Sequence, residues 1–600
     1  MKATLNGQEV SFEASETILE VARRQGVHIP TLCELHPIGH APGTCRACLV
    51  EMRAAEGQAV RHVTACDTPL TEGCAIQTRT PQVQEMRRLQ LEMLMADHNQ
   101  DCATCARGGD CELLDTARGV GLQRIRFDRR APAEPVLMQT GAIVYDASRC
   151  IRCMRCVAMC RNTQGVDALE FGGRGVASAV RLRATAEGDT ACVSCGQCVA
   201  VCPTGALAER NHIQQVVDYL GDPEIATVFQ IAPAVRVGFG EEFGLPAGSN
   251  IEGQIVAALH RIGARAVLDT SFAADLVIME EGHEVLERLR AGQGPVMTSC
   301  CPGWVTFAEK NFPGLLPHLS STRSPQQCLG SLAKRYLPQK LGVAPAQVRM
   351  VSIMPCTAKK DEAARAEFGE DGMRDVDVVL TIREFATLLR REGVDLKALE
   401  PQPFDSACLT EFTGAGVIFG ASGGVMEAAL RTLYFAVRGE ELGSIEVQAV
   451  RGDARLRSAA IDVGGDVGTV RVAICHGLAA ARELAQQMQD GIREYDFIEV
   501  MACPGGCING GGHLRSKRRY FKQVGDRRTA LFQADRAKSV RQSHRNVQIQ
   551  KLYAEFLEHP LSHRAHDMLH THYHACPQAD AVDVPAVWDE LAADRINRKE

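Results

Sequence analysis

The sequence predicts a multidomain protein in which α+β units precede a larger α/β unit. The chain has 600 residues, too many for a single hydrophobic core. Its 25 cysteines are grouped at regular spacings, mainly in the first third of the chain. From residue 226 onward, short apolar runs alternate with helical or glycine-rich segments, the pattern of parallel sheets covered by helices.

The composition indicates a soluble, mildly acidic protein. Charged residues make up 23% of the chain and the formal net charge is -7, so nothing suggests a nucleic-acid partner. No apolar run approaches the length of a membrane span. The N-terminus, MKATLNGQEVSFEAS, has no signal-peptide pattern, which predicts a cytoplasmic location. Since disulfides are rare there, the cysteine spacings indicate metal ligands.

Residues 1–80 predict a small [2Fe–2S] domain. Strand-like alternation at 3–10 and a helical pattern at 17–25 precede four spaced cysteines. A long first gap and then a close pair beside Gly43 are typical of four thiolates around such a cluster. A zinc ribbon, the alternative, normally uses two close pairs. The predicted ligands are Cys33, Cys45, Cys48 and Cys66.

Residues 81–130 predict a second cluster domain. Apolar residues at helical spacing over 85–98 would deliver His98 to three following cysteines, Cys102, Cys105 and Cys111. On spacing alone, zinc is a serious alternative for one histidine and three cysteines. The iron–sulfur patterns on both sides favour a [4Fe–4S] cluster.

Residues 138–215 contain the most specific pattern in the chain, C-x2-C-x2-C-x3-C repeated at 150–160 and 192–202. In two-cluster ferredoxins the fourth cysteine of each run ligates the other cluster. We therefore assign two [4Fe–4S] clusters, one to Cys150, Cys153, Cys156 and Cys202, the other to Cys192, Cys195, Cys198 and Cys160.

Residues 223–515 predict the α/β unit. Its expected buried strands are 226–232, 266–269, 275–280, 295–299, 349–354, 376–382, 470–475 and 496–501. No complete G-x-G-x-x-G or Walker loop follows a strand, so any nucleotide chemistry belongs to a partner.

Three of these strands run into cysteines, in PVMTSCC (295–301), VRMVSIMPC (348–356) and EVMACPGGCINGGG (499–512). The carboxyl ends of parallel strands form the ligand-binding edge of a sheet. Glycines after the last strand let the backbone come close to a bound group. These segments therefore predict one buried metal site.

The same three segments resemble the signature motifs of [FeFe]-hydrogenases: TSCCPGW at 298–304, MPCTAKKDE at 354–362 and EVMACPGGCINGGG at 499–512. The upstream region is similar to the iron–sulfur region that this family shares with respiratory complex I. SHRN at 543–546 and HTHY at 570–573 resemble the family's small subunit, fused as a tail over 516–600. The resemblance implies a β-grasp [2Fe–2S] domain, a [4Fe–4S] domain with one histidine and three cysteine ligands, a ferredoxin-like domain and a two-lobed H-cluster domain.

The resemblance also implies roles for residues around an H-cluster, a [4Fe–4S] cluster joined to a di-iron subsite that carries carbon monoxide, cyanide and a dithiolate amine. Cys301, Cys356, Cys503 and Cys507 would hold the [4Fe–4S] part, and Cys507 would bridge to the di-iron subsite. Cys300 would exchange protons with the amine, and Lys359 would bind a cyanide. The remaining pocket positions would be Pro233, Ala234, Gln326, Met354 and Met501.

A proton route can be argued partly from spacing. Glu281, Glu284 and Arg288 share one face if 281–290 is helical. The family's relay has matching residues, with Ser320 between the carboxylates. The alternative is a solvated charged helix face. For the histidine-rich tail (His559, His563, His566, His570, His572 and His574), a solvated strap is favoured over a metal site.

The resemblance implies reversible interconversion of H2 with protons and electrons. The electrons would leave through four accessory clusters. The complex-I-like front suggests a hetero-oligomer with a flavin-containing, NAD(P)-linked diaphorase; ferredoxin or formate dehydrogenase would use the same entry point. Maturation proteins would install the di-iron subsite. An H2 sensor and a non-catalytic electron-transfer or iron–sulfur assembly protein are the alternatives, but both would be expected to lose residues that this chain keeps, including Cys300 and Lys359.

Overall fold

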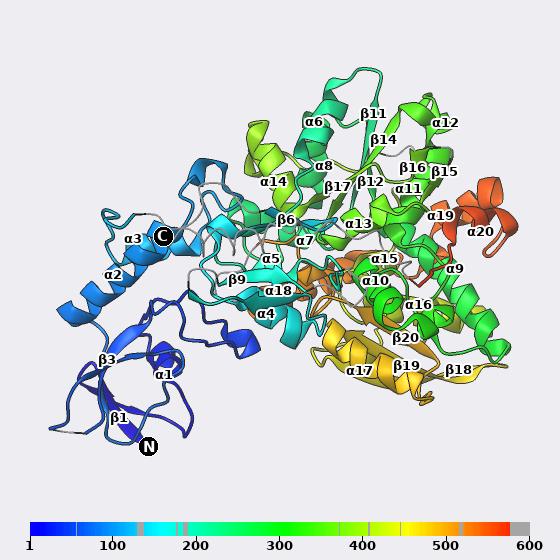
Figure 1. Ribbon diagram of the computed structural model, residues 1–600. Coiled ribbons are helices and arrows are strands. Elements are labelled where there is room, and N and C mark those ends of the chain that lie inside the picture. The colour runs from blue at the N-terminus through cyan, green and yellow to red at the C-terminus, as the bar shows by residue number, and fades with distance from the viewer. Residues whose placement is uncertain are drawn as a thin grey trace.

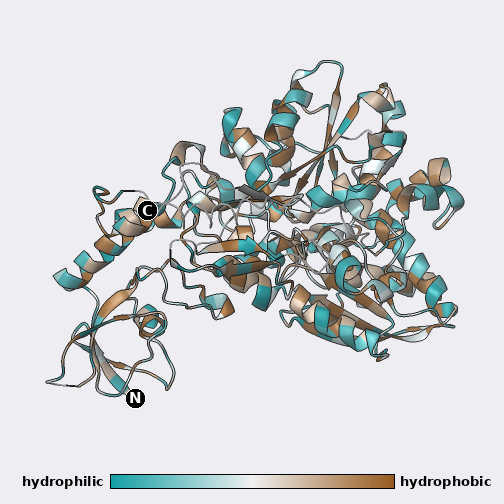
Figure 2. Ribbon diagram, in the orientation of Figure 1, coloured by the Kyte–Doolittle hydropathy of each residue, from teal (hydrophilic) through white to brown (hydrophobic). Residues whose placement is uncertain are grey.

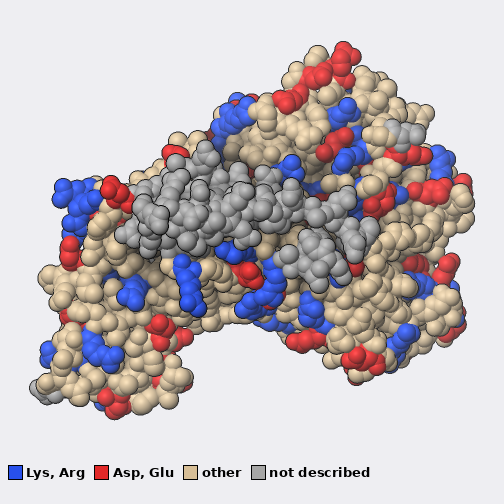
Figure 3. Space-filling model, in the orientation of Figure 1, with Lys and Arg blue, Asp and Glu red and all other residues tan. Residues whose placement is uncertain are grey.

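The computed structural model describes residues 1–55, 57–128, 137–175, 178–183, 190–370, 372–405, 409–444, 446–514 and 520–575, without the side chains of 137–139 and 520–522. A small N-terminal unit projects from a large body that contains most of the helices and sheets (Figure 1). Basic and acidic side chains are interspersed over the visible surface (Figure 3). No helix within the described ranges combines the length and apolar character that crossing a bilayer requires.

The N-terminal unit is a five-stranded sheet in the order β2-β1-β5-β3-β4. Its strands are β1 (Lys2–Leu5), β2 (Gln8–Ser11), β3 (Leu49–Arg53), β4 (Arg61–Thr64) and β5 (Ala75–Gln77). The strand-like residues 3–10 form two strands, because Asn6 and Gly7 adopt positive φ angles and turn the chain into a hairpin. Helix α1 (Ile18–Arg24) begins with a capping box between Thr17 and Glu20.

Helix α2 (Pro81–Asp97) and helix α3 (Glu112–Gly119) form the second unit. The buried Arg87 of α2 donates to the carbonyl groups of Leu49 and Thr78, which ties this helix to the first unit. His98 is the residue at which α2 ends, as the sequence predicted.

The third unit has a three-stranded antiparallel sheet, β10-β7-β6, and a separate hairpin, β8-β9. The short helices α4 and α5 each follow the first two cysteines of one C-x2-C-x2-C-x3-C run. Its elements are β6 (Leu137–Gln139), β7 (Ile143–Asp146), α4 (Arg155–Ala158), β8 (Leu169–Gly172), β9 (Ala179–Leu182), α5 (Gln197–Val201) and β10 (Leu207–Glu209).

Two four-stranded sheets form the framework of the α/β unit, seen in the upper and lower parts of the body in Figure 1. One is fully parallel, in the order β12-β11-β14-β17, and its strands are largely apolar (Figure 2). In the other, β13-β20-β19-β18, only β18 is antiparallel to its neighbour. The strands are β11 (Ala226–Ile231), β12 (Ala266–Asp269), β13 (Val296–Met297), β14 (Val348–Met354), β17 (Val378–Thr381), β18 (Leu456–Gly464), β19 (Gly468–His476) and β20 (Phe497–Met501).

One predicted strand, 275–280, is wrong. These residues lie inside helix α9 (Thr270–Arg290), whose side chains are buried on all sides over its first three turns. Such a helix shows a continuous apolar run instead of an amphipathic pattern, and a short apolar run does not distinguish a buried helix from a buried strand. The helix begins at Asp269, whose carboxylate accepts from the Ser271 backbone N–H.

The other helices surround the two sheets (Figure 1). They are α6 (Ile213–Gly221), α7 (Val235–Gly238), α8 (Glu252–Arg261), α10 (Pro302–Asn311), α11 (Pro325–Arg335), α12 (Leu337–Leu341), α13 (Ala358–Ala364), α14 (Ile382–Arg391), α15 (Gly414–Ile418), α16 (Gly424–Arg438), α17 (Leu478–Gln489), α18 (Tyr520–Ala537), α19 (Val547–Leu552) and α20 (His563–Leu569). The last two lie on the side of the body remote from the N-terminal unit (Figure 1).

Candidate active site

Four cysteines from three chain segments meet between the two sheets. Cys301 precedes α10 just after β13, Cys356 follows β14, and Cys503 and Cys507 follow β20. The sequence correctly predicted that strand ends deliver these thiols, although the strands come from two sheets. Burial is the first cause that raises the pKa of Cys356, to about 12, and the adjacent Cys301 thiol is the second. Burial, followed by neighbouring thiols, likewise raises the pKa of Cys503.

This donor set fits an iron–sulfur cluster. Four thiols without a carboxylate among them are the usual ligands of a [4Fe–4S] cluster, and a bound metal keeps such thiols deprotonated despite burial. Within the described ranges, no group of three or more His, Cys, Asp or Glu side chains has the arrangement of a single-ion site.

The glycines of the third motif allow protein segments, rather than only a bound group, to approach the loop. A Cβ atom on Gly511 would lie 2.5 Å from Gly196 Cα and would overlap the Cys195 carbonyl. A Cβ atom on Gly512 would lie 2.9 Å from the Pro355 carbonyl oxygen. The loop is therefore packed directly against both the ferredoxin-like unit and the second motif.

A cavity of about 70 Å³ lies beside the thiols and contains every predicted pocket position. It is lined by Cys300, Cys301, Cys356 and Cys507 together with Pro233, Ala234, Gln326, Met354, Lys359 and Met501. Thr270 and Ala274 also line it; the sequence reasoning missed them because the neighbouring segment of α9 was predicted to be a strand. Their i, i+4 spacing was the available signal.

Two polar side chains give this mainly apolar cavity its chemistry. Lys359 Nζ donates to Glu362 at 2.8 and 3.0 Å and to the Cys300 carbonyl at 3.3 Å. Gln326 donates through Nε2 to Glu362 at 2.9 Å, while its buried Oε1 has no partner among the described residues. A buried polar atom of this kind is normally satisfied by a bound group or water, so these residues fit a polar cofactor.

The predicted relay residues lie together on α9 and the loop before α11. Glu281 is buried, and its burial followed by the nearby Glu284 raises its pKa to about 8. Ser320 contacts Glu281 and donates through Oγ to Glu284 at 2.7 Å. Arg288 reaches Glu284 at 3.4 Å near the surface. The alternative of a fully solvated helix face is thus wrong for Glu281.

Cys300 stands at the inner end of this arrangement. It lines the cavity, and its thiol pKa is raised well above the ordinary value by burial and then by Glu281. A protonated thiol next to a carboxyl group with a pKa near neutrality can pass a proton in either direction.

Family models match along most of the chain. One described as iron only hydrogenase large subunit, C-terminal domain, matches residues 225–511, and one described as iron hydrogenase small subunit matches residues 522–576. Three others match upstream: a 2Fe-2S iron-sulfur cluster binding domain (1–81), an NADH-ubiquinone oxidoreductase-G iron-sulfur binding region (87–126) and a 4Fe-4S dicluster domain (149–206).

The chain is 42% identical to the NADP-reducing hydrogenase subunit HndD of Solidesulfovibrio fructosivorans, over 95% of this chain and 98% of that one. It is 36% identical to iron hydrogenase 1 of Clostridium pasteurianum, over 95% and 99%. The chain belongs to the [FeFe]-hydrogenase family. It is a catalytic [FeFe]-hydrogenase subunit with accessory iron–sulfur domains.

Two further proteins are similar to part of this hydrogenase. The structure of a variant of apo [FeFe]-hydrogenase HydA1 from Chlamydomonas reinhardtii superimposes with a TM-score of 0.54 at 39% identity, covering 61% of this chain and 99% of that one. The cytosolic iron-sulfur assembly component 3 of Bos taurus is 33% identical, over 65% of this chain and 84% of that one.

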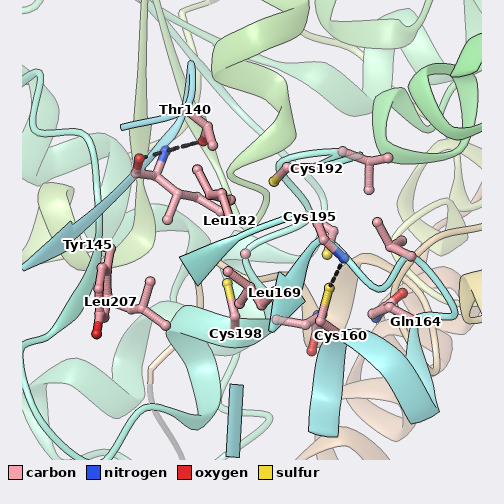
Figure 4. A pocket seen from close by; sticks show the side chains of 16 residues that line it. Thr140, Tyr145, Cys160, Gln164, Leu169, Leu182, Cys192, Cys195, Cys198 and Leu207 are labelled. Atoms are coloured by element: carbon pink, nitrogen blue, oxygen red, sulfur yellow. Dashed lines mark hydrogen bonds between the residues drawn. The ribbon is translucent and has the colours of Figure 1, made fainter. Parts of the chain in front are cut away.

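The hydrogenase also brings together the thiols predicted for its accessory clusters. Cys160, Cys192, Cys195 and Cys198 line one cavity of about 40 Å³ (Figure 4). The Ala168 backbone N–H donates to the Cys160 sulfur at 3.3 Å, as sulfur ligands of clusters are often bonded. Burial raises the pKa of all four thiols.

The other half of the ferredoxin-like unit gathers Cys150, Cys153, Cys156 and Cys202, where burial followed by the neighbouring thiols raises the pKa of Cys156. Cys202, the fourth cysteine of the second run, thus joins the first three cysteines of the first run, as the sequence predicted.

In the N-terminal unit, Cys33, Cys45, Cys48 and Cys66 are all buried and their thiols contact one another. The His98 set is mixed: His98 is buried, Cys105 and Cys111 are half-buried neighbours, and Cys102 is exposed.

Two hydrogen bonds that the sequence reasoning missed connect the ferredoxin-like unit to the active site. Gln197 Nε2 donates to the Asn509 carbonyl at 2.7 Å, and Thr357 Oγ1 donates to the Ser194 carbonyl at 2.6 Å. Gln197 and Ser194 lie within the second cysteine run, and Thr357 directly follows Cys356. Their contacts join residues more than 160 positions apart, so no local pattern marks them.

Proposed function

We propose that this hydrogenase holds an H-cluster through Cys301, Cys356, Cys503 and Cys507, with Lys359 and Gln326 facing its di-iron subsite. The observation that supports this most is the convergence of the four thiols beside a cavity lined by every predicted pocket residue. When bound, the H-cluster, with its carbon monoxide, cyanide and dithiolate ligands, supplies the chemistry that breaks and forms the H–H bond. Pro233, Ala234, Met354 and Met501 would keep water away from it.

Protons would travel between the cavity and the surface along side chains of the chain itself. Cys300 would exchange a proton with Glu281, whose raised pKa suits it to both accept and release one. Ser320 would connect Glu281 to Glu284, to which it donates at 2.7 Å. Arg288, partly exposed, would hold Glu284 at the surface end.

Electrons would travel through three accessory [4Fe–4S] clusters and one [2Fe–2S] cluster. The ligands would be those predicted from the sequence, in domains covering residues 1–80, 81–130 and 138–215, ahead of a two-lobed catalytic domain (223–515) and a small-subunit-like region (516–600). The five-stranded N-terminal sheet, with β1 parallel to β5 and α1 beside it, supports a β-grasp fold for the first domain.

We propose that the electron partner is a flavin-containing, NAD(P)-linked diaphorase subunit in a hetero-oligomer. The support is the similarity to an NADP-reducing hydrogenase subunit over nearly the full length of both chains. The sequence has no nucleotide-binding loop of its own, so the nucleotide would bind to the partner. Ferredoxin or formate dehydrogenase are alternative partners.

The site can be tested on protein purified without oxygen from a host that carries the maturation proteins. Infrared bands of metal-bound carbon monoxide and cyanide are expected, together with H2 evolution from reduced methyl viologen that Cys300→Ala nearly abolishes. An intact set of clusters without those bands or turnover would instead identify an electron carrier or an unmatured apo-enzyme. For the partner, H2-dependent reduction of NADP⁺ should require an added diaphorase subunit.

A further inference from the structure

The loop that presents Ser320 to the relay is paired with a strap, residues 569–571, from the C-terminal region. Thr322 and His570 form an antiparallel bridge. The Arg323 backbone N–H donates to the Leu569 carbonyl at 2.7 Å, and the Thr571 N–H donates to the Ser321 carbonyl at 2.8 Å. The relay loop is therefore held in place by a segment almost 250 residues away in the chain.

The His570 side chain lies at the centre of this pairing and is only 3% exposed, so the expectation of a solvated strap is wrong here. Its Nδ1 is 2.8 Å from Ser321 Oγ and its Nε2 is 3.0 Å from Glu280 Oε2. Glu280 is itself fully buried and also accepts from the Tyr553 hydroxyl and the Leu561 N–H. The imidazole thus bridges helix α9 to the relay loop.

Ser321 links His570 to the carboxylate of Glu284. Its backbone N–H donates to both oxygens of Glu284, at 3.0 and 3.1 Å, while its hydroxyl is held by His570. The adjacent Ser320 donates to the same carboxylate. A shift of Ser321 would therefore displace Glu284 and Ser320 together.

We propose that His570 is a positioning residue of the hydrogenase reaction, which fixes Ser321 and thereby the geometry of the Glu284–Ser320 step. This inference rests on the proton relay proposed above. It assigns the C-terminal region a part in proton transfer, in addition to covering the catalytic domain.

The contact geometry suits such a role, because both ring nitrogens of His570 have a partner. Glu280 Oε2 lies within hydrogen-bond distance of Nε2 and the Glu280 carboxyl group also accepts from Tyr553 and Leu561, while Nδ1 lies within hydrogen-bond distance of Ser321 Oγ. The charged and titratable groups around His570 are Glu280 and Glu284 from α9, Arg323 from the relay loop, Tyr553, and His566, which stacks on it.

The test compares His570→Leu and His570→Gln in the matured full-length hydrogenase. His570→Leu should lower H2 evolution about 10- to 100-fold, since a displacement of about 1 Å is enough for a loss of that size. The carbon monoxide and cyanide bands and the iron content should stay unchanged, and the solvent deuterium isotope effect should rise as proton transfer becomes limiting. His570→Gln should restore most of the rate, because its amide can donate to Glu280 and accept from Ser321.

His563→Gln is the matched control, because this exposed histidine lies on the same helix and pairs with Asp567 at the surface, and it should keep the wild-type rate. If His570→Leu fails to fold, Ser321→Ala removes the bonded hydroxyl while keeping the backbone N–H, and should reproduce the loss.

An unchanged rate and isotope effect in the folded His570→Leu protein, or in Ser321→Ala, would overturn the inference. Loss of the infrared bands in these variants alone would also overturn it, by showing a role in holding the cofactor. If instead the wild-type protein has no bands, or Cys300→Ala stays active, the proposed site or relay is what fails.

Discussion

Lys359 and Glu362, one turn apart on α13, form a buried ion pair beside the active-site cavity, with Nζ at 2.8 and 3.0 Å from the two carboxylate oxygens. Burial by itself would lower the pKa of Lys359, but Glu362, together with the nearby Cys356 and Cys300, more than compensates and the pKa is raised. The lysine therefore remains a cation that can hydrogen-bond a group in the cavity.

Replacing Glu362 by Gln should leave that buried cation without its charge partner. Breaking such a pair costs about 3–5 kcal/mol, so we expect a clearly lower unfolding temperature. Because burial alone lowers the pKa of Lys359, the unpartnered lysine of the variant should give up its proton more readily, so the difference should be largest near pH 6 and shrink as the pH rises towards 9. Glu367→Gln, at a more exposed glutamate, is the control. Equal melting curves for both variants would contradict the importance of the pair.

Glu281→Gln should lower the rate of H2 evolution and change how the unfolding free energy depends on pH. The variant cannot carry a proton, and H2 evolution should fall by about 10²- to 10⁴-fold. The folded protein binds the Glu281 proton more tightly than the unfolded chain does, because the pKa of this carboxyl is raised from 4.5 to about 8. The resulting stabilisation is complete below pH 4.5 and is lost as the pH rises to 8. The wild type should therefore lose about 1.4 kcal/mol per pH unit relative to the variant over that interval.

The measurement is the difference in unfolding free energy between the wild type and Glu281→Gln at pH 5 and at pH 8.5. Glu287→Gln, an exposed position on the same helix, should change neither turnover nor this difference. A difference in unfolding free energy that does not change with pH would contradict the raised pKa of Glu281.

Gly511→Ala should disturb the contact between the ferredoxin-like unit and the active site. The added methyl group would overlap backbone atoms of Cys195 and Gly196, which cannot rotate away as a side chain could. We expect a loss of about 1–3 kcal/mol in stability and slower reduction of the H-cluster from the accessory clusters. Gly525→Ala, which meets nothing within 4 Å, should be neutral or slightly stabilising in its helix. Similar effects of the two changes would contradict this packing argument.

Cys160→Ser should remove one accessory cluster. Because Cys160 shares a cavity with Cys192, Cys195 and Cys198, its loss should lower the iron content by about four atoms per chain. Cys328→Ser is the control, since Cys328 is buried but lies in no cysteine cluster of the described structure. Iron analysis and electron paramagnetic resonance of the reduced proteins would decide. An unchanged iron content in Cys160→Ser would remove this cysteine from the ligand set.

Local sequence patterns were sufficient to predict several parts of this hydrogenase. The paired cysteine runs predicted which thiols meet in each half of the ferredoxin-like unit, because their spacing is set by short helices such as α4 and α5. The apolar runs at β11, β12, β14 and β20 were recognisable because buried parallel strands are apolar on both faces.

The sequence by itself thus determined the family, the cysteine groups, most strands of the two sheets and the cysteine, lysine, glutamine and methionine residues around the cavity. Tertiary structure decided the rest. Burial on every side made part of α9 resemble a strand in the sequence, and contacts within the folded core bury His570 against Glu280. Short-range periodicity is encoded by neighbouring residues, whereas these features depend on segments that become neighbours only when the chain folds.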